Sequence, residues 1–358
     1  MKKIHVLVVE DSITVRKRIV AVLGADADME VVGEAADGKT GIELCRKLRP
    51  DVVTLDMMLP VMTGLAATEY IMAYCPTPIL IVSASTNRGE LFRTYSALAA
   101  GAVDVLEKPI GDEPDGAWER KLISTVKLVS RIKVITHLQG RLNKSSSRAL
   151  PELPSFPAGT APGPYRLVGI GTSTGGPAAC LEILRNLPPR FPLPILLVIH
   201  IGQAFGAALA EWLDSQSGIR VTCARDGEAL PPVGEPRVLI APPGHHLVLR
   251  QGRLRLTADP ERHSCKPSVD VLFESLAQEL AGQSIACLLT GMGRDGAAGL
   301  LAIRREGGRT LAQDQATSVV FGMPQEAIRI GAAERVLAIG QIAPALTALA
   351  GCDGREQV

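Results

Sequence analysis

The amino-acid sequence predicts two α/β domains, each built on a parallel sheet with helices packed against it. The chain has 358 residues, which is the usual length of two domains. Short apolar runs alternate with helical patterns in both halves, and most runs are near-continuous, as is typical of parallel strands covered by helices on both faces. A stretch rich in Gly, Pro and Ser separates the two halves and indicates the boundary between the domains.

Residues 1–124 are expected to form the first domain from five β/α units. The predicted strands are Ile4–Val9, Val31–Val32, Val52–Leu55, Ile79–Val82 and Val103–Leu106. Helical patterns separate these runs, and five such units in succession predict an open, doubly wound sheet.

Residues 125–164 are expected to connect the domains as a helix followed by a flexible linker. A helical pattern extends over Trp118–Leu138. Of the 25 residues in Gly140–Pro164, 12 are Gly, Pro or Ser. This composition buries too little apolar surface to offset the entropy lost on ordering, so a flexible segment is predicted.

Residues 165–352 are expected to form the second domain by the same alternation of strands and helices. Its predicted strands are Leu167–Ile170, Ile195–Ile199, Val238–Ile240 and Ile285–Leu289. Helical patterns at Ala178–Leu187 and Val269–Leu280 lie between them. The motifs of this half differ from those of the first, so the two domains are not repeats.

Composition disfavours several classes of protein. A formal net charge of +1 gives no sign of a nucleic-acid binder. The apolar segments are far shorter than the ~18–20 residues needed to cross a bilayer, so no membrane insertion is expected. The 7 cysteines form no C-x-x-C pair, which fits reduced thiols and a cytoplasmic location.

Three carboxylates are predicted to meet at the carboxyl edge of the first sheet. Glu10 and Asp11 follow the first strand, and Asp56 follows the third. Close carboxylates repel one another unless a hard divalent cation such as Mg²⁺ lies between them. Ser83 follows the fourth strand and Lys108 the fifth, so a hydroxyl and an ammonium can complete a phosphoryl-binding pocket. Taken singly, these residues also fit helix caps and turns.

The segments VVEDS, DVVTLDMMLPVMTGL, IVSAS and GAVDVLEKP resemble the receiver domain of two-component response regulators, over about residues 3–124. The resemblance implies a flavodoxin-like fold in which Asp56 accepts a phosphoryl group from a chemotaxis histidine kinase. The implied Mg²⁺ ligands are Glu10, Asp11, Asp56 and the backbone carbonyl of Met58. The implied contacts to the phosphoryl group are Ser83 and Lys108.

Three positions depart from the pattern common in receiver domains. Met58 stands where chemotaxis relatives often have Glu, and Thr63 stands where the loop often has Asp. Val105 replaces the aromatic residue of many receivers, so no aromatic side chain is available there to relay a signal.

A serine in a glycine-rich turn characterises the second domain. The strand Leu167–Ile170 is followed by GTSTGGP and a predicted helix, which places Ser173 in a G-x-S-x-G pattern between strand and helix. There a hydroxyl can be exposed beside helix N-terminal amides. One alternative is a turn in which Ser or Thr caps the helix. A dinucleotide-binding turn is disfavoured because Thr174 replaces the third glycine and no acidic residue lies about 20 positions on.

A serine nucleophile needs a base, and His200 is the best placed of the 6 histidines. It follows the strand Ile195–Ile199, at the same sheet edge as Ser173. The alternative is a strand-end histidine bonded only to the backbone. Weaker candidates, in turns or loops, are His245, His246 and His263. An unperturbed imidazole base predicts loss of activity in acid, with a midpoint within about one unit of pH 6.5.

Asp295 is the predicted orienting acid. The strand Ile285–Leu289 leads into TGMGRDG and a helical pattern, so Asp295 lies beyond a third strand end. Helix capping is the alternative for this residue. Ser173, His200 and Asp295 can therefore form a nucleophile, base and acid triad by topology. Backbone amides around Thr174 and Met292 are the candidate donors to an oxyanion.

The segments GIGTSTGGP, TGMGRDG, PSVDVLFESLA, APPGHHLVL and DQATSVVFGMP resemble the catalytic domain of bacterial chemotaxis protein-glutamate methylesterases, over about residues 165–350. The resemblance implies that Ser173, His200 and Asp295 hydrolyse glutamate γ-methyl esters on methyl-accepting chemoreceptors without a cofactor, under control of receiver phosphorylation. Some relatives also deamidate receptor glutamines. Ile199 and Gly202 depart from the family, since many relatives have Gln and Pro near the base.

Two other functions stay open at the level of sequence. The second domain can be a non-enzymatic output module that binds a signalling partner, with Ser173 as a helix cap. A DNA-binding output would need a basic recognition helix, whereas this domain is charge-balanced and about twice the size of such modules. Methanol release distinguishes an esterase from either alternative.

Overall fold

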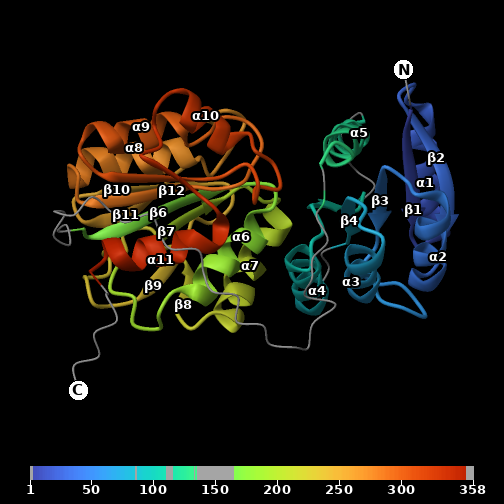
Figure 1. The fold of residues 1–358 in the computed structure, drawn as a ribbon, viewed down its shortest axis with the longest axis horizontal. Helices are drawn as coiled ribbons and strands as arrows, with labels where there is room; N and C mark the ends of the chain where they lie inside the picture. Colours follow the sequence, from blue (N-terminus) through green and yellow to red (C-terminus); the bar gives the residue numbers. More distant parts are fainter. Residues whose placement is uncertain (1–2, 85–86, 110–115, 133, 135–164, 352–358) are drawn as a thin grey trace. The chain divides into compact units, whose positions relative to one another are not determined.

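The computed structural model describes residues 3–84, 87–109, 116–132, 134 and 165–351. The chain divides into two compact units, Met1–Ser146 and Ser147–Val358, which are described separately (Figure 1). Both units have parallel sheets with helices against them, so the predicted α/β class is confirmed. Among the described residues, no helix is long and apolar enough to cross a bilayer.

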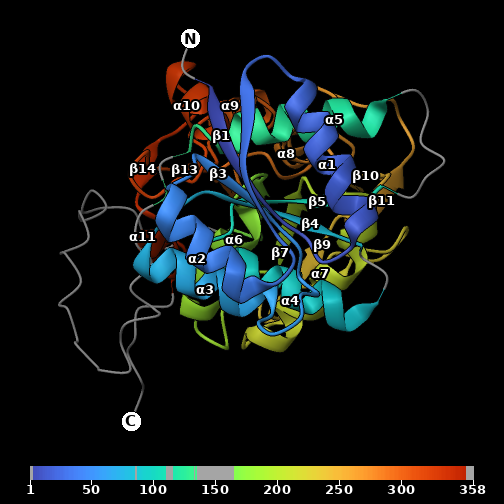
Figure 2. The ribbon, with the colours of Figure 1, turned by 90° about the vertical axis from the view of Figure 1, so that its right-hand side faces the viewer.

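The first unit contains a five-stranded parallel sheet in the order β2-β1-β3-β4-β5. Its strands are β1 (Ile4–Val9), β2 (Met29–Ala35), β3 (Val52–Leu55), β4 (Ile79–Ser83) and β5 (Asp104–Glu107). Its helices are α1 (Ile13–Ala25), α2 (Gly38–Leu48), α3 (Gly64–Tyr74), α4 (Arg88–Ala99) and α5 (Ala117–Val129). Helices α1 and α5 cover one face and α2, α3 and α4 the other (Figure 2), as the doubly wound prediction requires.

Burial on both faces of this sheet explains the apolar runs. Every residue of β3 and β4 is buried, as expected for central strands of a parallel sheet. Helices α2, α3 and α4 begin at side-chain caps on Asp37, Thr63 and Asn87, each of which accepts a backbone N–H of the first turn. Thr63, one of the departures from the receiver pattern, therefore stabilises the start of α3.

Helix α5 extends the first unit beyond residue 124, where the sequence places the domain boundary. Val126 and Val129 are buried, and α5 packs against α1. The helix ends at Val129 rather than at Leu138, and Ser130 bonds its hydroxyl and amide back to carbonyls of the last turn. Residues 135–164 lie outside the described residues, so the flexible linker stays a prediction.

The second unit contains a seven-stranded parallel sheet in the order β14-β13-β12-β6-β7-β9-β8 and a separate antiparallel hairpin, β10–β11. The sheet strands are β6 (Leu167–Thr172), β7 (Ile195–Ile199), β8 (Arg220–Cys223), β9 (Arg237–Ile240), β12 (Ser284–Leu288), β13 (Arg309–Gln313) and β14 (Arg335–Leu337). The hairpin strands are β10 (His246–Arg250) and β11 (Arg253–Thr257).

Helices cover both faces of this second sheet (Figure 1). They are α6 (Gly176–Asn186), α7 (Gln203–Gln216), α8 (Val269–Leu280), α9 (Ala297–Arg305), α10 (Met323–Arg329) and α11 (Ile339–Leu349). Helices α8 and α9 pack together on one face, and α6 packs against α7 and α11 on the other. The central strands β12, β6 and β7 are therefore buried on both sides, and only their ends are free to carry a site.

The bounds of β7 and α8 agree with the sequence prediction, whereas β8, β13, β14 and the hairpin are absent from it. Strands β8, β11, β13 and β14 mix Arg, Thr or Gln with apolar residues, so no near-continuous apolar run marks them, whereas β10 contains a short apolar run, Leu247–Leu249. Strands β8 and β14 also lie at the two edges of the sheet, where burial on both faces is not required.

Candidate functional site

The predicted acidic cluster of the first unit is brought together at the ends of β1 and β3. Ligand oxygens of Glu10, Asp11 and Asp56 lie within 4.8 Å of one another. Glu10 and Asp56 are buried, each with 1% of its surface exposed, whereas Asp11 is exposed. The cluster is therefore closed on the protein side and open to solvent at Asp11.

Lys108 neutralises part of this charge. Its Nζ lies 2.9 Å from Asp56 Oδ2 and 2.9 Å from Glu10 Oε2. Burial and the Asp56 carboxylate raise the pKa of Glu10 to about 7, and burial also raises the pKa of Asp56. Burial lowers the pKa of Lys108, but the two carboxylates outweigh it and raise that pKa. The single ammonium of Lys108 therefore does not bring the pKa values of both buried carboxyls back to their ordinary range.

These residues fit a hard divalent cation. The buried Asp56 Oδ1 accepts no hydrogen bond in the described structure, so an oxygen ligand is available. Carboxylate oxygens are the donors that Mg²⁺ prefers. Met58, the predicted source of a carbonyl ligand, lies in the loop after β3 and has an exposed side chain whose sulfur accepts a hydrogen bond from Arg93.

Ser83, a predicted phosphoryl contact, forms a hydrogen bond with Glu90, a residue that the sequence did not predict for this site. Its buried hydroxyl donates to Glu90 Oε1 at 2.6 Å, and the amide of Ala84 donates to the same oxygen at 2.9 Å. Glu90 lies in the first turn of α4 and is 4% exposed. The Ser83 hydroxyl must therefore leave Glu90 before it can donate to a phosphoryl oxygen.

In the second unit, strand pairing places Ser173 and His200 side by side. Thr172 pairs with Ile199 at the ends of β6 and β7, and the amide of His200 donates to Thr172 O at 3.0 Å. Ser173 and His200 are the next residues on the two neighbouring strands, so they share one edge of the sheet. Among the described residues no hydrogen bond joins the Ser173 hydroxyl to His200, and such bonds often tighten only when substrate binds.

The glycine-rich turns after β6 and β12 are packed against each other around Ser173. The amide of Ser173 donates to Thr290 O at 3.0 Å, and the hydroxyl of Thr172 donates to the same oxygen at 2.8 Å. A Cβ on Gly291 would come within 2.7 Å of the Ser173 Cβ. Gly175 has a φ of +80°, which a residue with a Cβ rarely adopts. The glycines are thus required both for the turn and for the close approach.

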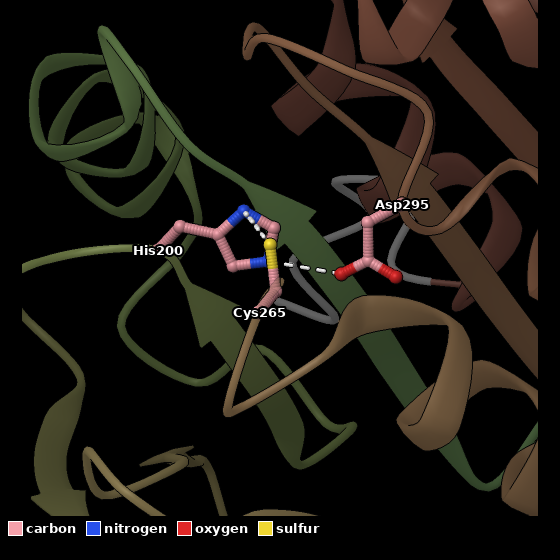
Figure 3. Close-up of side chains that lie close together, drawn as sticks. All are labelled: His200, Cys265 and Asp295. Atoms are coloured by element: carbon pink, nitrogen blue, oxygen red, sulfur yellow. Dashed lines mark hydrogen bonds and ion pairs between the residues drawn. The ribbon is translucent and has the colours of Figure 1, made fainter. Parts of the chain in front are cut away.

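His200 and Asp295 form the bond that the predicted triad needs. His200 Nε2 lies 2.9 Å from Asp295 Oδ2 (Figure 3). Asp295 is 2% exposed. Its carboxylate accepts further hydrogen bonds from the Ser268 hydroxyl at 2.7 Å and from the amides of Val269 at 2.7 Å and Asp270 at 3.1 Å.

The start of α8 is the element that orients this carboxylate, and sequence reasoning missed it. Asp295 receives the first amides of α8, so it acts as an anion at a helix N-terminus while it also binds His200. Burial raises the pKa of Asp295, but the bonds from His200 and Ser268 outweigh it and hold the pKa below its ordinary value. The capping alternative is wrong for the helix that follows Asp295, because the N-cap of α9 is Gly296 and that helix has no side-chain cap; the carboxylate instead accepts the first amides of α8.

The other ring nitrogen of His200 faces Cys265, a second residue absent from the predicted site. Cys265 Sγ lies 3.6 Å from His200 Nδ1 (Figure 3). Burial lowers the pKa of His200, but the bonds to Asp295 and Cys265 outweigh it and raise the pKa to about 9. This pKa lies above the ordinary imidazole value from which the midpoint near pH 6.5 is expected, because the buried carboxylate stabilises the imidazolium.

The remaining candidates occupy distinct environments. Thr174 is 8% exposed and its carbonyl accepts from the Thr290 hydroxyl, whereas the side chain of Met292 is 57% exposed beside the same turn. His246 is buried and accepts from the amide of Ser268 through Nδ1, so it supports the start of α8. The weaker base candidates His245 and His263 are exposed, and His263 Nε2 lies 3.3 Å from Asp270 Oδ2.

Two family models match the chain. The CheB methylesterase model matches residues 168–346, and the response regulator receiver domain model matches residues 6–114. These matches favour an enzyme over a non-enzymatic or DNA-binding output for the second unit.

Proteins of similar sequence match this chain over nearly the full length of both. A protein-glutamate methylesterase/protein-glutamine glutaminase of Anaeromyxobacter dehalogenans is 43% identical over 97% of both chains, and one of Nitrosospira multiformis is 42% identical over 99% of both. The crystal structure of the Thermotoga maritima CheB methylesterase catalytic domain is 39% identical, with a TM-score of 0.49 over 52% of this chain and 98% of that one. The chain therefore belongs to the CheB family of chemotaxis protein-glutamate methylesterases, with a response regulator receiver domain at its N-terminal end.

Proposed function

We propose that this protein is a phosphorylation-activated serine esterase that demethylates glutamate γ-methyl esters on methyl-accepting chemoreceptors. The observation that carries the proposal is the His200–Asp295 hydrogen bond of 2.9 Å beside Ser173 on the neighbouring strand end. The names of the relatives support ester hydrolysis at protein glutamate and deamidation at protein glutamine. The family resemblance supports the receptor as substrate and a chemotaxis histidine kinase as phosphodonor.

In this mechanism each ring nitrogen of the base has its own role. Asp295 accepts from Nε2, so Nδ1 is the atom that can accept the proton of the Ser173 hydroxyl. Ser173 Oγ then bonds to the ester carbonyl carbon, and the imidazolium returns the proton to the departing methoxy oxygen, which leaves as methanol. Water, activated by the same nitrogen, cleaves the acyl-enzyme and restores Ser173. Deamidation follows the same steps with ammonia as the leaving group.

Charge developing on the carbonyl oxygen needs donors in the two glycine-rich turns. The backbone amides around Thr174 and Met292 are the candidates, because these turns pack against each other at Ser173. Asp295 contributes by keeping one tautomer of His200 and by stabilising its protonated form.

Control by phosphorylation is assigned to the acidic cluster. Asp56 is the acceptor, with Glu10, Asp11 and the Met58 carbonyl as the remaining ligands that would hold Mg²⁺. The ion would neutralise the incoming phosphoryl oxygens. Lys108 is already directed at Asp56, and Ser83 would transfer its hydroxyl from Glu90 to the phosphoryl group.

Methanol release from a methylated receptor fragment tests the esterase. Ser173→Ala should lower the rate roughly 10³-fold or more while the circular dichroism spectrum and the unfolding midpoint stay close to those of the parent. Ser215→Ala is the matched control, because Ser215 is exposed on α7, donates to Trp212 O and accepts from the neighbouring Gln216 side chain, and has no bond to a residue of the candidate site. Near-normal methanol release by folded Ser173→Ala would contradict the proposed nucleophile.

A further inference from the structure

Ser83 and Asp56 share one edge of the first sheet. Strands β3 and β4 pair in parallel, with Leu55 opposite Ile81. Asp56 follows β3, and Ser83 is the last residue of β4. A phosphoryl group on Asp56 would therefore need the Ser83 hydroxyl as a donor from the neighbouring strand end.

Glu90 already accepts the donors at this strand end. Its Oε1 accepts the Ser83 hydroxyl at 2.6 Å and the Ala84 amide at 2.9 Å. A carboxylate oxygen and a phosphoryl oxygen are both anionic acceptors, and hydrogen bonds to such acceptors are short and strong. A serine hydroxyl has one proton, so it cannot donate to both acceptors at once. Glu90 thus binds Ser83 in the way that a phosphoryl oxygen would.

Burial makes this contact costly to break. Ser83 is 0% exposed and Glu90 is 4% exposed, so bulk water does not readily replace a donor that leaves. A buried carboxylate that loses a donor is destabilised by the lost hydrogen bond and by its own desolvation. Phosphorylation of Asp56 must offset this cost before the Ser83 hydroxyl becomes available.

The same contact links the phosphorylation site to helix α4. Glu90 is the third residue of α4, and its amide donates to the side chain of the N-cap residue Asn87 at 2.9 Å. Thr94, one turn further along α4, donates its buried hydroxyl to Ser83 Oγ at 3.5 Å. Two side chains of α4 therefore contact Ser83, so a movement of Ser83 changes the contacts of the first turns of this helix.

We propose that Glu90 is a positioning residue that competes with the phosphoryl group for the Ser83 hydroxyl, and that it thereby opposes phosphorylation of Asp56. The apparent affinity of the receiver for a phosphoryl group is lowered by the fraction of molecules in which Glu90 holds Ser83. Release of this bond then transmits phosphorylation to the start of α4. The inference rests on the proposed phosphorylation of Asp56, and it does not depend on the chemistry of the esterase.

Binding of beryllofluoride tests the competition without reference to activity, because with Mg²⁺ this anion mimics a phosphoryl group on an aspartate. Titration calorimetry of the full-length protein measures its Kd. Glu90→Ala should bind roughly tenfold more tightly than the parent, and the nearly isosteric Glu90→Gln should show a smaller gain because its amide oxygen still accepts without a charge. Glu119→Gln is the matched control, since it removes a carboxylate from the first turn of α5 that pairs with Arg18. Asp56→Asn provides the blank.

The Ser83→Ala background separates competition for the hydroxyl from a simple loss of negative charge. Removal of a charge would tighten anion binding equally with or without Ser83, whereas competition requires the hydroxyl. In Ser83→Ala protein, the gain from Glu90→Ala should therefore shrink to roughly twofold or less. Equal gains in the two backgrounds, or no gain in folded Glu90→Ala and Glu90→Gln, would overturn the role of Glu90.

The same titrations distinguish failure of this inference from failure of the proposed function. A parent protein that binds no beryllofluoride would overturn the phosphorylation of Asp56 and the role of Glu90 with it. A parent that binds beryllofluoride but releases no methanol would overturn the esterase alone, and the Kd values of the Glu90 variants would still decide the competition.

Discussion

At the scale of single residues, we expect the ionisation of His200 to determine the pH dependence of the esterase. Its pKa is raised to about 9, so the imidazolium predominates at neutral pH and cannot accept a proton. We expect kcat/KM to increase with pH and to level off with a midpoint near 9, rather than near 6.5. The measurement is the initial rate of methanol release from pH 6 to 10 at subsaturating substrate.

Spontaneous ester hydrolysis also accelerates in base, so Ser173→Ala provides the blank at every pH. A parent profile that is already flat between pH 7 and 9 would contradict the raised pKa. The same shift affects stability with a defined sign. Because the folded pKa exceeds the ordinary 6.5, the charged pair with Asp295 stabilises the fold fully below about pH 6.5, and this contribution is lost as pH rises through about 9.

At the scale of elements, the start of α8 is the support that orients the acid of the site. The Ser268 hydroxyl donates to Asp295 at 2.7 Å and also accepts from the amide of Val271 as the helix cap. Ser268→Ala should destabilise the fold by about 1–3 kcal/mol through the loss of a charged hydrogen bond and a cap. We also expect kcat to fall roughly tenfold with KM little changed, because Asp295 loses a positioning bond. Denaturant unfolding and steady-state kinetics measure the two effects.

Ser275→Ala is the matched control for this prediction. Ser275 lies on the same helix, is 8% exposed, and bonds to Leu249 and Leu272 rather than to Asp295. Its loss should lower stability without lowering kcat at a temperature where the fold is intact. Ser268→Thr should recover most of the rate. A normal kcat in folded Ser268→Ala would mean that α8 holds Asp295 adequately through its amides alone.

At the scale of the whole molecule, the receiver is expected to restrain the esterase until Asp56 is phosphorylated. The linker that the sequence predicts, about 25 residues long, would have an r.m.s. span of roughly 25–30 Å and give one domain a millimolar-scale effective concentration at the other. Residues 150–358 alone should therefore release methanol faster than the unphosphorylated full-length protein. A small phosphodonor with Mg²⁺ should raise the full-length rate toward that of the fragment.

Asp56→Asn full-length protein should stay at the low rate when the phosphodonor is added. Asp28→Asn, which changes an exposed carboxylate paired with Lys127, should respond like the parent. A fragment no faster than its unphosphorylated parent would refute inhibition by the receiver, and would favour a receiver that activates the enzyme or recruits its substrate.

The sequence by itself determined the fold class, both motif sets and most of the chemistry-bearing residues. Near-continuous apolar runs predict β1, β3, β4 and β7 because parallel strands covered on both faces admit few polar residues. Residues after such strands must lie along one edge, so Asp56, Ser173 and His200 could be located from connectivity alone. Edge strands such as β8 and β14 could not be predicted in this way, because strands buried on one side only have no near-continuous apolar run.

Only the tertiary structure decided which groups surround these residues. Ser268 and Cys265 are 27 and 65 positions away from the partners they contact, Asp295 and His200. Glu90 binds Ser83 across the loop between β4 and α4. No local pattern encodes these contacts, because they depend on how the start of α8 and the preceding turn pack over the ends of β6, β7 and β12. The same packing excludes water from Asp295 and raises the pKa of His200, so the working pH of the base is a property of the fold.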